Sequence, residues 1–219
     1  MIPDEIQITL LSETTFGRGD GVAGLIDEEV QHDVHGFPYL AGRTLKGLLQ
    51  ECCADIYFSA QKIGDTAFLE SLSTSALALF GQSGALLSGG QSNLHIGNAV
   101  ISPDLQEAIR QVKLDSTQVL SLFTTLRRQT QIEPNGVAKE NSLRTARVIL
   151  RETVFYAPLV FIAAPAPETV ALLAACVSAL RQAGSSRNRG TGWVQAKLFA
   201  QGQDITSLCL ENFEKQVNV

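Results

Sequence analysis

Three stretches of the sequence place arginine and lysine where a chain can approach an anion. The first is GFPYLAGRTLKGLLQECC at residues 36–53, where a turn leads into an amphipathic helix with Arg43 and Lys46 at its start. The first amide groups of a helix lack intrahelical partners, so cations beside them suit an anion. Thr44, or Gly42 before it, is expected to cap this turn, with both cations pointing outward. A turn with solvated cations is the alternative.

The second stretch is GSSRNRGTGW at residues 184–193, which holds Arg187 and Arg189 among three glycines and two serines. It follows a predicted helix and precedes a predicted strand. A Walker loop or a dinucleotide-binding fingerprint needs the opposite order, so both are excluded. A glycine-rich loop lets its backbone approach a ligand closely, and arginines beside exposed amides suit a phosphodiester backbone. The alternative is an ordinary connection between two elements.

The third stretch is a predicted basic β-hairpin at residues 127–151. Six bases against Glu133 and Glu140 give it a local charge of +4. Its Gln, Thr, Asn and Ser side chains can contact sugars and phosphates. An edge hairpin that is basic only to prevent aggregation is the alternative. The bases are Arg127, Arg128, Lys139, Arg144, Arg147 and Arg151.

Carboxylates dominate residues 1–40, where eight acids stand against Arg18 alone, a local charge of −7. Such a segment repels a polyanion unless its carboxylates act on that polyanion or bind a metal. His32, Asp33 and His35 lie close together, but no second cluster of His or Cys accompanies them. We therefore predict no metal site built by the protein alone. A solvated acidic surface is the alternative.

The chain as a whole has the composition of a globular protein. It has 219 residues, 45% of them hydrophobic, and a net charge of −5. Its four cysteines lack the spacing of a metal site, and their number indicates no disulfide framework. The sequence shows no apolar run long enough to span a membrane and no signal peptide at its start. A cytoplasmic protein without a membrane partner is expected.

Hydrophobic periodicity predicts one α+β domain over residues 1–219, with a ferredoxin-like, split βαβ sheet that carries insertions. Helices are expected to cover one face of the sheet and to leave the other face free to bind. A flexible connection is expected at 81–92. Strands are expected at 5–12, 93–102 and 193–200. Two β-rich runs are expected within 120–164, on either side of a turn at 134–136. Helices are expected to begin at 45 and to span 65–81, 104–114 and 167–184.

These motifs together resemble the RAMP superfamily of CRISPR-associated proteins. The resemblance rests on GLIDEEVQHDVHGFPYLAGRTLKGLLQE at residues 24–51, LFG at 79–81 and GSSRNRGTGWV at 184–194, in this order. The family pattern combines an acidic run, a turn ending in a Gly-[SR]-[ST]-Leu-Lys-Gly motif, and a late glycine-rich loop. GRTLKGLLQE and the run at 127–150 are most similar to type III effector complexes, within them to the III-D-like branch.

The resemblance implies a ferredoxin-like (RNA-recognition-motif-like) core that holds a guide RNA within a ribonucleoprotein. The hairpin at 127–151 would be the thumb that enters the guide–target duplex, and residues 184–192 the glycine-rich loop. The implied partners are guide RNA, single-stranded target RNA, other RAMP subunits and the large signalling subunit. The expected RNA ligands are Arg43, Thr44, Lys46, Arg127, Arg128, Arg144, Arg147, Arg187, Arg189, Gly190 and Gly192.

The resemblance also gives the acids a role, because Asp27 occupies the position of the aspartate with which type III backbone subunits cut target RNA. The 2′-hydroxyl of the target would attack the adjacent phosphate, assisted by Mg²⁺ or another divalent ion held loosely by carboxylate and phosphate oxygens. Two alternatives stay open. In the first, the chain is a non-catalytic subunit that caps one end of the guide. In the second, it is a guide-processing ribonuclease that uses His32, His35 or His95.

Overall fold

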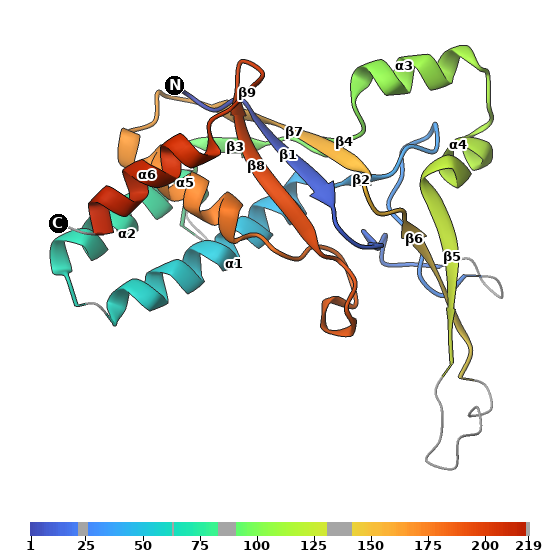
Figure 1. The fold of residues 1–219 in the computed structure, drawn as a ribbon, viewed down its shortest axis with the longest axis horizontal. Coiled ribbons are helices and arrows are strands. Elements are labelled where there is room, and N and C mark those ends of the chain that lie inside the picture. The colour runs from blue at the N-terminus through green and yellow to red at the C-terminus, as the bar shows by residue number, and fades with distance from the viewer. Residues whose placement is uncertain (22–25, 63, 83–90, 131–141, 218–219) are drawn as a thin grey trace.

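The computed structural model describes most of the chain and arranges it around one antiparallel sheet (Figure 1). The turn predicted at 134–136, Lys139 and most of the connection predicted at 81–92 lie outside the described residues. Over the described ranges, no helix combines the length and the apolar character needed to cross a bilayer. The described residues are 1–21, 26–62, 64–82, 91–130 and 142–217.

Seven strands of the described chain form the main sheet, in the order β2-β4-β7-β1-β8-β9 with β3 also beside β7. All neighbouring strands run antiparallel. The central strand β1 lies between β7 and β8, its neighbours on the two sides. The strands are β1 (Glu5–Leu10), β2 (Tyr39–Leu40), β3 (Leu94–Ile96), β4 (Ala99–Val100), β7 (Val154–Phe161), β8 (Val194–Ala200) and β9 (Gln203–Asp204).

One face of this sheet packs against a layer of four helices and forms the core. Successive side chains of a strand point to opposite faces, and in β1 it is Ile6, Ile8 and Leu10 that are fully buried. α5 lies between α1, α2 and α6, and most of its side chains are buried. The sheet is thus held from one side. The helices are α1 (Gly42–Gln61), α2 (Thr66–Phe80), α5 (Pro167–Ala179) and α6 (Thr206–Val217).

A second unit stands away from the helical layer, on the right of the view in Figure 1. It begins with α3 (Pro103–Gln111) and α4 (Ser116–Phe123) and continues into a two-stranded hairpin of β5 (Thr124–Gln129) and β6 (Arg144–Ile149). The hairpin extends beyond the main sheet (Figure 1). It therefore presents both faces of its strands to other parts of the chain or to a ligand.

The α+β class, with an antiparallel sheet and a one-sided helical layer, is confirmed. The amphipathic spacing predicted from residue 45 is also confirmed, since Leu45, Leu48, Leu49 and Cys53 are buried on one side of α1. Gly81 ends α2 as predicted, with a φ of 73° that favours glycine.

Two predictions about elements are wrong, and two elements were not predicted. Residues 120–123 were expected to be β but are helical, because Asp115 and Gln118 form a capping box that starts α4. The helix expected to reach Gly184 ends at Ala179. Neither the strand β9 nor the helix α6 was predicted, although Asp204 accepts hydrogen bonds from Thr206 at the start of α6, which is a sequence-local signal.

The start of α1 is capped from a distance rather than by Thr44 or Gly42. Ala41 is the N-cap and makes no side-chain capping bond. Instead the Gly42 amide donates to Asn98 Oδ1 over 3.0 Å, from the connection between β3 and β4. A Cβ on Gly42 would lie 2.2 Å from the carbonyl oxygen of Ile96, so only glycine allows this approach.

The two glycines of the GRTLKG motif are expected to respond oppositely to alanine. In Gly42→Ala the new methyl group pushes the start of α1 away from the Ile96 carbonyl of β3, which should lower the free energy of unfolding by about 1–3 kcal/mol. Gly47 is an exposed residue of the same helix with open space around its Cβ position, so Gly47→Ala should raise that free energy by about 0.5–1 kcal/mol. Urea denaturation of both variants checks this. Equal effects would contradict the close approach of α1 to β3.

Candidate nucleic-acid interface

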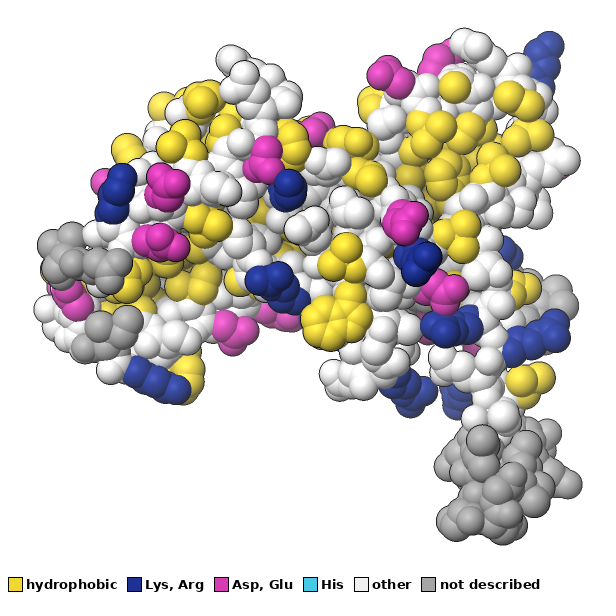
Figure 2. All heavy atoms as spheres, in the orientation of Figure 1, with side chains coloured by type: hydrophobic (Ala, Val, Ile, Leu, Met, Phe, Trp, Pro, Cys, Tyr) yellow, Lys and Arg dark blue, Asp and Glu magenta, His cyan; other side chains and the backbone are white. Residues whose placement is uncertain are grey.

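An open groove of about 1560 Å³ lies between the hairpin and the glycine-rich loop. Figure 2 shows Lys and Arg side chains gathering in this part of the molecule, at the lower right of the view. Segments far apart in the sequence meet there. The residues that carry its charge are Asp27 and Glu28 from the segment after β1, Arg127 and Arg144 from the hairpin, and Arg187 and Arg189 from the loop.

The pairing of β5 with β6 decides which hairpin cations face the groove. Arg127 lies opposite Ala146 and Gln129 opposite Arg144, so these four side chains share one face. Each of the four lines the groove. Arg128 and Arg147 belong to the other face, because a strand alternates its side chains. The hairpin therefore directs two of its predicted RNA ligands, Arg127 and Arg144, into the groove.

The glycine-rich loop has a backbone shape that depends on its glycines. A Cβ on Gly184 would lie 2.5 Å from the Thr15 carbonyl oxygen, and one on Gly192 would lie 2.4 Å from the Ala183 carbonyl oxygen. Gly190 has a φ of 78° and open space around it. A short 3₁₀ turn, Arg187–Arg189, carries the two arginines. The loop is thus packed at both ends and exposed at its middle.

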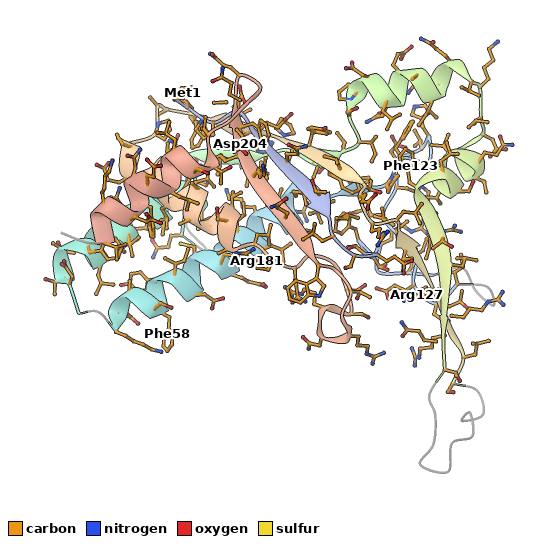
Figure 3. The ribbon with its side chains drawn as sticks, in the orientation of Figure 1. Met1, Phe58, Phe123, Arg127, Arg181 and Asp204 are labelled. Carbon is orange, nitrogen blue, oxygen red and sulfur yellow. The ribbon has the colours of Figure 1, made fainter. Side chains whose placement is uncertain are left out.

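Exposed ion pairs hold two of the groove arginines in the free chain. Arg127, labelled in Figure 3, has its Nη1 atom 2.8 Å from Glu13 Oε2, and Arg187 Nη1 lies 3.4 Å from Glu51 Oε2. Solvated pairs of this kind contribute little to stability, about 0–1 kcal/mol. A phosphate can replace the carboxylate, since a guanidinium binds either with the same planar fork.

Asp27 lies in the groove with its carboxylate held by the hairpin. Its Oδ2 atom accepts the Thr145 amide over 2.6 Å, and its own amide donates to the Thr145 carbonyl over 2.8 Å. The side chain is nevertheless exposed. The predicted catalytic carboxylate thus bonds to Thr145, the residue that follows Arg144 in the basic hairpin.

Arg147, a predicted RNA ligand, forms a partly buried ion pair within the protein. Its Nε atom lies 2.8 Å from Glu29 Oε1, with exposed fractions of 18% and 5% for the two side chains. Its Nη1 atom donates to Thr124 Oγ1. The prediction did not single out Glu29. The alternation of β6 is the signal that separates Arg147 from Arg144.

The cations at the start of α1 do not join the groove. Lys46 does not point outward as predicted, because its ammonium donates to Ser92 Oγ over 2.5 Å and to the Leu94 carbonyl over 2.8 Å. Burial lowers the pKa of this ammonium below its usual value. Lys46 thus ties α1 to β3. Arg43 and Thr44 are exposed, but they do not line the groove.

The described residues contain no group of three or more His, Cys, Asp or Glu side chains that could hold a metal ion. Two carboxylates, Asp27 and Glu28, line the groove. Carboxylates with phosphate oxygens and water are the ligands that Mg²⁺ prefers, so this donor set fits an ion that binds with the substrate. His32, His35 and His95 do not line the groove.

Comparison with known proteins confirms the family resemblance. A family model described as the RAMP superfamily matches residues 7–195. A cryo-EM structure of Type III-B Cmr-beta bound to cognate target RNA has a TM-score of 0.60 and 11% identity, over 90% of this chain and 97% of that chain. The apo state of Type III-B Cmr-beta has a TM-score of 0.60 and 12% identity, over 92% and 99%. No curated protein matches.

The two kinds of arginine in the hairpin are expected to differ in their effect on stability. Arg147→Met leaves the Glu29 carboxylate buried without its partner and should lower the free energy of unfolding by about 3–5 kcal/mol. Arg127→Met removes an exposed pair and should cost about 0–1 kcal/mol. Urea denaturation of the two variants measures the difference. Equal losses would contradict the burial of the Arg147–Glu29 pair.

Proposed function

Because the chain belongs to the RAMP superfamily, we propose that it is an RNA-binding subunit of a type III CRISPR effector complex. The observation that carries this proposal is the groove, where Arg127, Arg144, Arg187 and Arg189 face one open space. These four guanidinium groups outnumber the two carboxylates of the groove, Asp27 and Glu28, so the groove is basic where a phosphodiester backbone can bind. The likeness in fold to Type III-B Cmr-beta, one structure of which holds target RNA, supports an RNA partner.

The proposal includes a ferredoxin-like core with the hairpin as thumb, within one RAMP domain over residues 1–219. The strand order β8-β1-β7-β3, antiparallel throughout, supports the core. α1 and α2 follow β1, and α5 follows β7, as the split βαβ arrangement requires. The position of the hairpin beyond the sheet (Figure 1) and its basic residues support its role as the thumb. Other RAMP subunits and the large signalling subunit are the proposed protein partners.

The proposed reaction is cleavage of target RNA beside Asp27. The target's 2′-hydroxyl loses its proton to the carboxylate as its oxygen forms a bond with the adjacent phosphorus. The bond from phosphorus to the 5′-oxygen breaks, and that oxygen takes a proton from water. The products are a 2′,3′-cyclic phosphate end and a 5′-hydroxyl end. Groove arginines stabilise the charge that develops on the phosphate oxygens. A divalent ion on Asp27 and Glu28 would supply further stabilisation of that charge.

A non-catalytic capping subunit is the second candidate, and the hydrogen bond from the Thr145 amide to Asp27 favours it. That bond gives the carboxylate a structural role that needs no chemistry. In this case the same groove would hold one end of the guide. The guide-processing ribonuclease finds no support, because the groove offers no histidine from the described residues as a general acid or base.

Affinity for RNA is expected to depend on salt and on the loop arginines. Arg187→Ala and Arg189→Ala should each weaken binding and reduce the slope of log K against log salt by about 0.7, the value for one phosphate of a single strand. Lys197→Met, which removes an exposed ion pair between Lys197 on β8 and Asp204 on β9, is the matched control. Fluorescence anisotropy over a salt series measures this. A flat salt dependence would contradict phosphate binding in the groove.

Cleavage of target RNA is expected to need the charge of Asp27. In Asp27→Asn the side-chain oxygen still accepts the Thr145 amide, so the fold and the bound RNA are retained, but the base is lost. The rate of cutting at one position should fall by about 10²–10⁴-fold in the purified complex. Asp20→Asn, in the same acidic segment but outside the groove lining, should cut normally. Undiminished cutting by Asp27→Asn would favour the capping subunit.

A further inference from the structure

Residues 27 and 28, within the acidic segment after β1, are hydrogen-bonded to the hairpin. Glu28 and Ala146 form a parallel bridge, and the Arg147 amide donates to the Glu28 carbonyl over 2.9 Å. The Asp27 amide and carboxylate both bond with Thr145, as described above. Residues 27–29 therefore lie beside β6 as a short extended piece joined by one isolated bridge, called the third strand below, although no periodicity in the sequence indicates a strand there.

The Arg147–Glu29 pair fixes this third strand from the side. Glu29 Oε1 accepts both the Arg147 Nε and the Val30 amide, each within 3.0 Å. Thr15 Oγ1 donates to the Arg147 carbonyl over 2.9 Å, which joins the first residues after β1 to the same point. Arg147 thus joins β6 to β5 and to Glu29 through its guanidinium, and to Thr15 through its backbone carbonyl.

Burial distinguishes this pair from the other ion pairs of the described chain. Its two side chains are 18% and 5% exposed, whereas both side chains are more than 30% exposed in pairs such as Arg127–Glu13 and Arg187–Glu51. A buried pair must repay the loss of hydration of both ions, and apolar residues of similar size are often as stabilising. What an ion pair adds is a fixed relative orientation of its two side chains, because the planar guanidinium donates its hydrogen bonds to a carboxylate in a defined geometry.

We infer that Glu29 and Arg147 are positioning residues that fix the place of the cut in bound RNA. The inference rests on the proposed function and deepens it. Arg144 and Arg127 contact the RNA backbone from the hairpin, and Asp27 acts on it from the third strand. Because the buried pair locks that strand to β6, the phosphate that Arg144 binds and the phosphodiester that Asp27 faces are at a constant separation along the RNA.

The test removes the pair without leaving a buried charge. In the double variant Glu29→Gln/Arg147→Met the glutamine oxygen still accepts the Val30 amide, and the methionine replaces the apolar stem of the arginine. The variant is assembled into the complete complex with guide RNA, and end-labelled target RNA is cut under single-turnover conditions. Sequencing gels give both the rate and the position of every cut. Lys197→Met, which removes an exposed pair, is the matched control.

The expected result is a complex with normal guide content whose Asp27-dependent cut slows by a factor on the order of 100 and spreads over neighbouring phosphodiesters. Lys197→Met should keep the wild-type rate and a single cut. A single cut at the wild-type position and rate in the double variant overturns the inference. A uniform loss of rate without any spread also overturns it, because loss of stability alone would produce that result.

A second measurement tests the attachment of the Asp27 segment to β6 without depending on catalysis. Amide hydrogen exchange of peptides covering residues 144–148 should be faster in the double variant, because the Thr145 and Arg147 amides lose their partners on the Asp27 segment. Unchanged exchange overturns the inference. If the wild-type complex itself makes no Asp27-dependent cut, the proposed catalysis fails first and takes the inference with it, so the two failures are distinguishable.

Discussion

The attachment of the segment after β1 to the hairpin is the interaction on which the rest of the structure depends. Without it, the acidic segment and the basic hairpin would be two independent surfaces of opposite charge. With it, Asp27 lies beside Arg144 in a groove that the glycine-rich loop closes from the other side. Burial of Glu29 with Arg147 neutralises one charge of each sign at the junction.

The charges of this chain therefore fall into two classes with different physical roles. Arg147 and Lys46 are partly or mostly buried, bonded to the protein, and serve the fold. Arg127 and Arg187 form solvated pairs that are weak enough to exchange a carboxylate for a phosphate. A net charge of −5 is compatible with RNA binding because the groove, and not the whole surface, sets the local potential.

The sequence predicted the sheet, the helical layer and the family, because hydrophobic periodicity and glycine-rich motifs are local signals. It also predicted that Arg187, Arg189 and Asp27 carry function, but it could not bring them to one place, since their meeting depends on the path of the chain between β1 and α1. The prediction for Lys46 failed because Ser92, its partner, lies 46 residues away. Alternation along β6 could have separated Arg147 from Arg144, but no local signal indicates the partner of Arg147, because Glu29 lies 118 residues away.

The central claim is that the chain binds RNA as a subunit of a type III effector complex, and the RNA that accompanies the protein tests it most directly. The tagged chain would be expressed with the other subunits of its complex and with a CRISPR repeat array, purified at moderate salt, and its bound RNA sequenced. The account predicts uniform guide RNAs that share a repeat-derived end, and loss of that RNA when the groove arginines are replaced. A folded, partner-bound protein that carries no RNA would contradict it.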